Sequence, residues 1–134
     1  MAGATGGIRW GRALAGAVMV EVVLGLVAVP AFVLAADPNA LLNVVIPPAS
    51  FLAAMLVVAW LFRRSERPVA NGIATGIGCA LLYVLLGVGA YLIAPGRVDM
   101  SQSLGLPYLA SHALKILGGA AGGWWIERKR ATPV

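Results

Sequence analysis

The sequence has little of what most catalytic and metal sites are made from. It contains one cysteine, one histidine and five acidic residues in 134. The single cysteine, Cys79, cannot form an intramolecular disulfide, so the redox compartment stays undetermined. A lone histidine, His112, cannot complete a two-histidine haem site or a zinc site within one chain. No nucleophile stands beside a base and no carboxylates are paired, so we expect no enzyme activity, no catalytic residue, no metal and no cofactor.

Charged residues are also scarce. They make up 11% of the chain, whereas 60% of the residues are apolar. Soluble domains carry roughly 25% charged residues and could not bury so much apolar surface. A lipid bilayer can, because about 20 apolar residues cross its hydrocarbon core as a helix. The net charge of +5 does not indicate a nucleic-acid partner, because the basic residues sit in short clusters between apolar runs. The expected partner is the lipid bilayer.

Four apolar runs are each long enough to cross a membrane. They cover residues 13–34, 41–62, 69–94 and 106–126. None alternates apolar and polar residues as barrel strands do, and backbone groups in hydrocarbon must bond internally, so each run is expected to be a helix. The linkers are short, which makes neighbouring helices antiparallel. We predict an all-α integral membrane four-helix bundle, up-down-up-down, forming a single domain over residues 1–134.

The first run has a second interpretation as a cleaved signal peptide. Arginines precede it, and residues 33–35 resemble a cleavage site. However, the run is longer than the roughly 7 to 15 residues of a signal-peptide core, and it carries Glu21 in its middle. A retained span fits the pattern better.

The basic residues predict an orientation, because cytoplasmic flanks of spans hold an excess of arginine and lysine. Eight of them fall on one side of the predicted membrane: Arg9, Arg12, Arg63, Arg64, Arg67, Arg128, Lys129 and Arg130. On the other side the sequence places only Arg97. All four tryptophans lie at the arginine-rich boundary. We expect both termini in the cytoplasm and a multi-pass location in the inner (plasma) membrane.

Two charged residues fall deep inside the predicted spans. Glu21 lies nine residues beyond Arg12, about 13 Å into the membrane, and Lys115 lies thirteen residues before Arg128, about 20 Å in. A lone charge near the bilayer centre costs about 2.5 to 3.5 kcal/mol, so opposite charges at similar depth are expected to meet. We predict a Glu21–Lys115 ion pair between the first and fourth helices. It either fixes helix register or takes part in ion or proton movement.

Other polar residues accompany this pair. On the fourth run, one arc of the helix surface holds Tyr108, Ser111, His112, Lys115, Gly118, Gly119 and Gly122, and it is expected to face protein rather than lipid. His112 is interpreted as a hydrogen-bonded core residue or a proton-handling group. The predicted intramembrane polar cluster consists of Glu21, Thr75, Tyr83, His112 and Lys115.

Glycines recur four residues apart on the third and fourth runs. The predicted helix-packing residues are Gly72, Gly76, Gly118, Gly119, Gly122 and Gly123. Small residues at this spacing let helix backbones approach closely. The contact is either within the chain, or with a second copy or another membrane protein.

Two prolines, Pro47 and Pro48, fall inside the second run, where proline removes backbone hydrogen bonds. They indicate either a plain kink near the outer end of the helix or a broken helix. In a broken helix, Asn43 and Ser50 could form a transporter-like site.

Short stretches in the last two runs, and just before the third, carry a family likeness. They are Glu66-Arg67 followed by Asn71-Gly72, Gly76 and Leu81-Leu82-Tyr83, and then Leu117-Gly118-Gly119 with Gly122-Gly123. Through these stretches the chain resembles a family of small bacterial four-span membrane proteins. The likeness extends over most of the chain. The resemblance implies the four-span layout and carries no activity across.

Two functions from different classes remain. The favoured one is a non-enzymatic accessory or scaffolding membrane subunit that packs on a partner through its glycine-rich faces. Two opposed charges leave little unbalanced charge for coupling, which favours this interpretation. The alternative is a small oligomeric transporter or channel that moves protons or a small solute through Glu21, His112 and Lys115. The expected protein partner is accordingly a second copy of the chain or another membrane protein.

Overall fold

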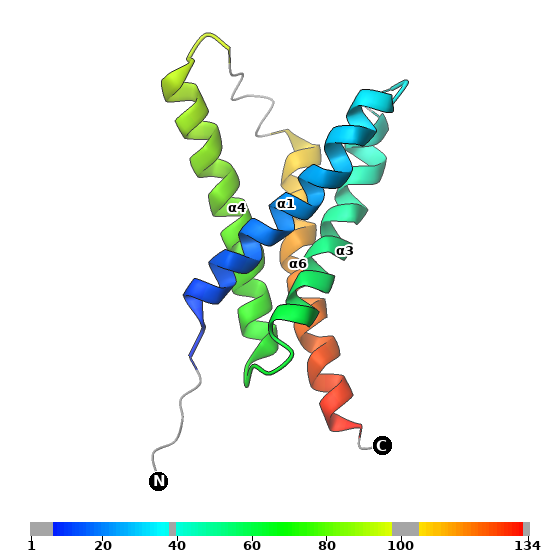
Figure 1. Cartoon of the computed structure of the whole chain (residues 1–134), viewed down its shortest axis with the longest axis vertical. Helices are drawn as coiled ribbons and strands as arrows, with labels where there is room; N and C mark the ends of the chain where they lie inside the picture. The colour runs from blue at the N-terminus through cyan, green and yellow to red at the C-terminus, as the bar shows by residue number, and fades with distance from the viewer. Residues whose placement is uncertain (1–6, 38–39, 98–104, 133–134) are drawn as a thin grey trace.

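The computed structural model describes residues 7–37, 40–97 and 105–132, and in these ranges the regular structure is entirely helical (Figure 1). The elements are α1 (Trp10–Leu34), η1 (Leu41–Val45), α3 (Ile46–Leu61), α4 (Pro68–Ile93) and α6 (Leu106–Ala131). The all-α prediction is confirmed for this part of the chain. The bounds agree with the four apolar runs to within one residue, except that α1 begins three residues earlier and α6 continues five residues further.

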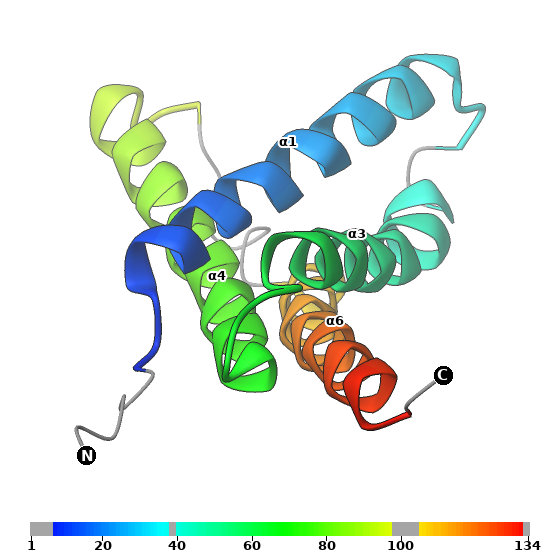
Figure 2. The same ribbon diagram turned by 60° about the horizontal axis from the view of Figure 1, so that its bottom comes forward.

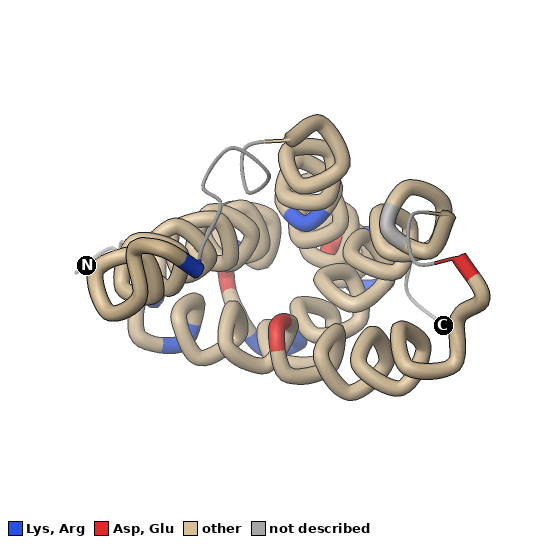
Figure 3. Tube along the Cα trace, turned by 90° about the horizontal axis from the view of Figure 1, so that it is seen from above, with Lys and Arg blue, Asp and Glu red and all other residues tan. Residues whose placement is uncertain are grey.

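Among the described residues, three helical stretches are long and apolar enough to cross a membrane. They are Trp10–Leu34, Asn43–Leu61 and Pro68–Ile93. The fourth helix, α6, is outside this set and is less apolar on average, and its inward face carries the buried residues Ser111 and Lys115. Its outward face is apolar, with Leu109 and Leu117 exposed. Figure 3 shows how few charged residues lie along the helices.

Prolines mark the beginnings of two helices. α4 and α6 each have proline in the first turn, where the missing N–H breaks no hydrogen bond. At its other end α6 carries three basic residues in its last turn, which favours extension because cations stabilise a helix C-terminus.

Pro47 and Pro48 do not break the second run. They lie in the first turn of α3, directly after the π-helical turn η1, and the N–H of Ile46 donates to the carbonyl of Leu41. The chain therefore stays helical from Leu41 to Leu61. The broken-helix alternative is wrong, because a change of winding absorbs the prolines near the end of the helix.

The four long helices form two layers. α6 lies between α3 and α4 and packs against both, while α1 crosses over α3 and α4 (Figures 1 and 2). α1 and α4 begin, and α3 and α6 end, toward the lower end of Figure 1. We call this end of the molecule the basic end, because most of the described arginines flank the helix termini that lie there. The opposite end of the molecule is called the far end. Toward the far end α4 leans away from α1 (Figure 1).

Close glycine contacts hold α6 against α4 in the basic half. A Cβ on Gly72 would overlap the carbonyl of Gly119, and a Cβ on Gly119 would overlap the carbonyl of Gly72. Gly76 meets the backbone of Ile116 in the same way, and Gly123 meets that of Pro68.

A second glycine face holds α6 against α3. A Cβ on Gly118 would overlap the carbonyl of Phe51, and one on Gly122 would overlap the carbonyl of Met55. All six predicted helix-packing glycines are thus buried against other helices of the same chain.

The apolar core lies between α1 and this three-helix layer. One group of buried residues, which includes Ala13, Val58 and Phe62, lies near the basic end. A second group, which includes Val20 and Val57, continues toward the middle. The basic half of the molecule is therefore densely packed.

Candidate functional site

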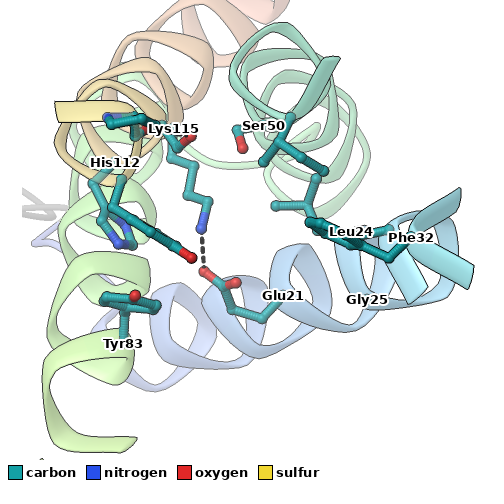
Figure 4. A pocket seen from close by; sticks show the side chains of 13 residues that line it. Glu21, Leu24, Gly25, Phe32, Ser50, Tyr83, His112 and Lys115 are labelled. Carbon is teal, nitrogen blue, oxygen red and sulfur yellow. Dashed lines mark hydrogen bonds and ion pairs between the residues drawn. The ribbon is translucent and has the colours of Figure 1, made fainter. Parts of the chain in front are cut away.

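An ion pair joins α1 to α6. The Nζ atom of Lys115 donates to Oε1 of Glu21 at 2.7 Å, which confirms the pairing predicted from the sequence. The Lys115 side chain is 6% exposed and the Glu21 side chain 30%. Because α1 packs mainly on α3 and α4, this bond reaches across the space between the two layers (Figure 4).

That space is a pocket of about 270 Å³, which we call the central pocket. Its polar lining is formed by Glu21, Ser50, Tyr83, Tyr108, Ser111, His112 and Lys115. Figure 4 shows these groups converging from all four long helices. The pocket runs from the ion pair toward the far end, where Phe32, Ile46 and Pro107 line it.

The two sides of the central pocket differ in chemistry. On the α1 and α3 side, apolar residues such as Leu24 and Phe32 accompany Glu21 and Ser50. On the α4 and α6 side it is aromatic. The rings of Tyr83 and Tyr108 stack with centroids 5.7 Å apart, and the His112 ring lies 4.7 Å from that of Tyr83.

Two buried polar atoms in this pocket, Oγ of Ser50 and Nδ1 of His112, find no hydrogen-bond partner among the described residues. Ser50 is 0% exposed. Hydroxyl groups in helices commonly donate to the carbonyl four residues earlier. Thr75 donates in this way to Asn71 at 2.9 Å, and Ser111 does so to Pro107 at 2.9 Å. The Ser50 hydroxyl instead remains without a partner beside the central pocket.

The structure brings together four of the five residues predicted for the polar cluster. Glu21, Tyr83, His112 and Lys115 line the central pocket. Thr75 does not line it. It lies two turns from Tyr83 along α4, about 12 Å closer to the basic end. There it packs beside α1, where a Cβ on Gly16 would lie 3.1 Å from its methyl carbon.

Ser50 and Tyr108 belong to the site although the predicted cluster omitted them. The sequence pointed to Ser50 only through the prolines before it and to Tyr108 only through its place on the polar arc. Helix periodicity places Tyr108 on the same arc as His112 and Lys115, which is a signal that could have included it. No sequence signal shows that the Ser50 hydroxyl avoids its own backbone.

A separate polar junction lies at the basic end. Oδ1 of Asn71 accepts a hydrogen bond from the Arg9 N–H at 2.8 Å. Its Nδ2 donates to Oγ of Ser65 at 3.0 Å and to the carbonyl of Arg67 at 2.8 Å. Arg130 reaches the same turn, because its guanidinium donates to the carbonyls of Ser65 and Arg63. This junction ties the start of α1 and the end of α6 to the α3–α4 turn.

The central pocket is lined by a mixed set of charged, aromatic and hydroxyl side chains. Among the described residues, no three histidine, cysteine, aspartate or glutamate side chains gather in a group that could hold a metal ion. The pocket instead combines one cation, one anion, aromatic rings and two unsatisfied polar atoms.

Comparison with known proteins assigns the chain to no family. No family model, no curated protein and no solved structure matches the chain. The likeness to small bacterial four-span proteins therefore stays a prediction from the sequence.

Proposed function

We propose that the chain is a four-span protein of the inner (plasma) membrane that carries a small solute across the bilayer through the central pocket. In this proposal the helices alternate up-down-up-down and both termini are cytoplasmic, so the basic end faces the cytoplasm. Two cation–π contacts at that end support the placement: Arg128 lies over Trp124, and Lys129 lies over Trp125. Such residues anchor helices at the membrane surface.

α6 serves as the fourth span although its average polarity is higher. Its polar residues face the other helices, and its exposed face presents Leu109, Leu117 and Trp124. A helix with this division can contact lipid on one side and line a polar pocket on the other.

The observation that carries the proposal is the Glu21–Lys115 pair, with Lys115 buried and Glu21 partly exposed, beside two unsatisfied polar atoms in the central pocket. Charged residues inside a membrane commonly mark substrate or ion pathways. A pair with a purely structural role would need no adjoining space. Here about 270 Å³ adjoins it, close to the lower limit of about 300 Å³ for small-molecule sites.

The glycine contacts argue against the accessory-subunit hypothesis in its original form. That hypothesis uses the glycine faces for docking on a partner, but Gly72, Gly119 and the other four pack within the chain. A partner would need a different surface. A homo-oligomer remains compatible with transport, and native mass spectrometry after mild extraction distinguishes it from a stoichiometric complex with another protein.

Access to the pocket tests the transport proposal without knowledge of the solute. The variant Ser50→Cys, combined with Cys79→Ala, is treated with a charged, membrane-impermeant methanethiosulfonate from either side of sealed vesicles. A transporter exposes its site alternately, so we expect modification from both sides.

The matched control is Ala54→Cys in the same background. Ala54 is one turn further along α3, is 0% exposed and does not line the central pocket. We expect it to remain unmodified. Modification of the Ser50→Cys variant from one side alone, or from neither side, would contradict transport.

A further inference from the structure

The hydrogen-bond donors that line the central pocket indicate the charge of the solute that it binds. A lysine ammonium carries three N–H donors, and the described residues offer Lys115 one acceptor, on Glu21. The Ser50 hydroxyl is a further donor without an acceptor. Both residues line the pocket from adjoining helices, α6 and α3 (Figure 4). A carboxylate fits such a set, since it is an acceptor-only group that can take several hydrogen bonds.

A second group of atoms in the same pocket favours a cation. The Glu21 carboxylate is partly exposed, and the stacked rings of Tyr83 and Tyr108 line the α4 and α6 side. Aromatic faces attract ammonium groups, and more strongly away from water. The unpartnered Nδ1 of His112 is a further acceptor when the ring is neutral.

Charge balance decides between a solute with a single charged group and a zwitterion, which carries one group of each sign. The pocket contains one positive and one negative side chain, so its net charge is zero. A solute with only a carboxylate or only an ammonium would leave an uncompensated charge in a site of low dielectric constant, which is unfavourable. A zwitterion brings one carboxylate and one ammonium into the pocket, so the net charge of the occupied pocket remains zero.

The pocket volume and the apolar side set the solute's size. A cavity of about 150 Å³ accommodates benzene, and this pocket measures about 270 Å³. Leu24, Phe32 and Ile46 provide apolar contacts for a short side chain.

We therefore propose that the central pocket binds a small zwitterion of the amino-acid class. Its carboxylate lies against Lys115 and Ser50, and its ammonium lies toward Glu21 and the tyrosine rings. This inference rests on the proposed function and names the solute class for the same site.

The test is equilibrium binding to the whole chain in lipid nanodiscs, with three matched probes. L-leucine is the zwitterion, leucinamide lacks the carboxylate, and N-acetyl-L-leucine lacks the ammonium. We expect L-leucine to bind at least about tenfold more tightly than either derivative, the equivalent of about 1.4 kcal/mol. Equal affinities for the three probes, or no binding of L-leucine, would overturn the assignment.

A pair of variants separates the site from non-specific binding. Ser50→Ala is expected to weaken L-leucine binding about tenfold without lowering the melting temperature, because the hydroxyl has no partner in the protein. Leu109→Ala, on the outward face of α6, is expected to bind as the wild type does. Equal affinities of the two variants would contradict the site.

The access experiment tests transport and the binding experiment tests the solute class, so each claim can be contradicted without the other. Modification of the Ser50→Cys variant from both sides, with no L-leucine binding to the unsubstituted protein, would keep transport and remove the solute class. L-leucine binding with modification from one side would keep the solute class and remove transport.

Discussion

Gly72 of α4 and Gly119 of α6 meet backbone to backbone, and a Cβ on either would overlap the carbonyl oxygen of the other. This contact holds α4 and α6 close together in the basic half of the molecule. Toward the far end α4 leans away from α1, and the central pocket occupies the region between the layers (Figures 1 and 4). One tight contact and one open region thus lie along the same pair of helices, α4 and α6.

The glycine contact gives the first prediction. Gly119→Ala is expected to destabilise the protein by about 1 to 3 kcal/mol, because the added methyl forces two backbones apart. The measurement is thermal unfolding in detergent. Gly87→Ala is the matched control, since a Cβ there meets nothing within 4 Å. Alanine is the better helix former by about 1 kcal/mol, so Gly87→Ala should be neutral or stabilising. Similar losses in both variants would contradict the close approach.

The Asn71 junction gives the second prediction. Asn71→Leu removes three hydrogen bonds and leaves the Arg9 N–H and the Ser65 hydroxyl without this partner. We expect a loss of about 1 to 3 kcal/mol, the cost of stranding a buried polar group. The start of α1 should also loosen, which faster hydrogen exchange near Arg9 would report.

The matched control for Asn71 is Thr75→Val, one turn along the same helix. It removes a single hydrogen bond, to the carbonyl of Asn71 in its own helix. We expect a smaller loss and unchanged exchange near Arg9. Equal exchange in the two variants would show that Asn71 does not hold α1.

Much of the fold could be predicted, because the hydrocarbon solvent restricts the choices. Long apolar runs have to be helices there, and two charges at similar depth have to meet. The structure accordingly has helices in the four runs, and the Glu21–Lys115 bond measures 2.7 Å. Whether those helices cross a membrane remains part of the proposal.

The details of the site could not be predicted in the same way. Thr75 and Ser50 are both buried hydroxyl residues in apolar runs, yet Thr75 donates to its own helix and Ser50 does not. That difference depends on side-chain rotamers and on neighbouring helices, and helix periodicity carries no information about either. The glycine spacing likewise indicated close packing but not which helix would be the neighbour.

The measurement closest to the central claim is a double-mutant cycle on Glu21 and Lys115, read as thermal unfolding in detergent. Removing one member of a buried pair strands the other charge and costs about 3 to 5 kcal/mol, whereas removing both costs less. We therefore predict that Lys115→Met destabilises the protein more than Glu21→Gln combined with Lys115→Met. Equal or additive losses would contradict the pair, and the site built around it.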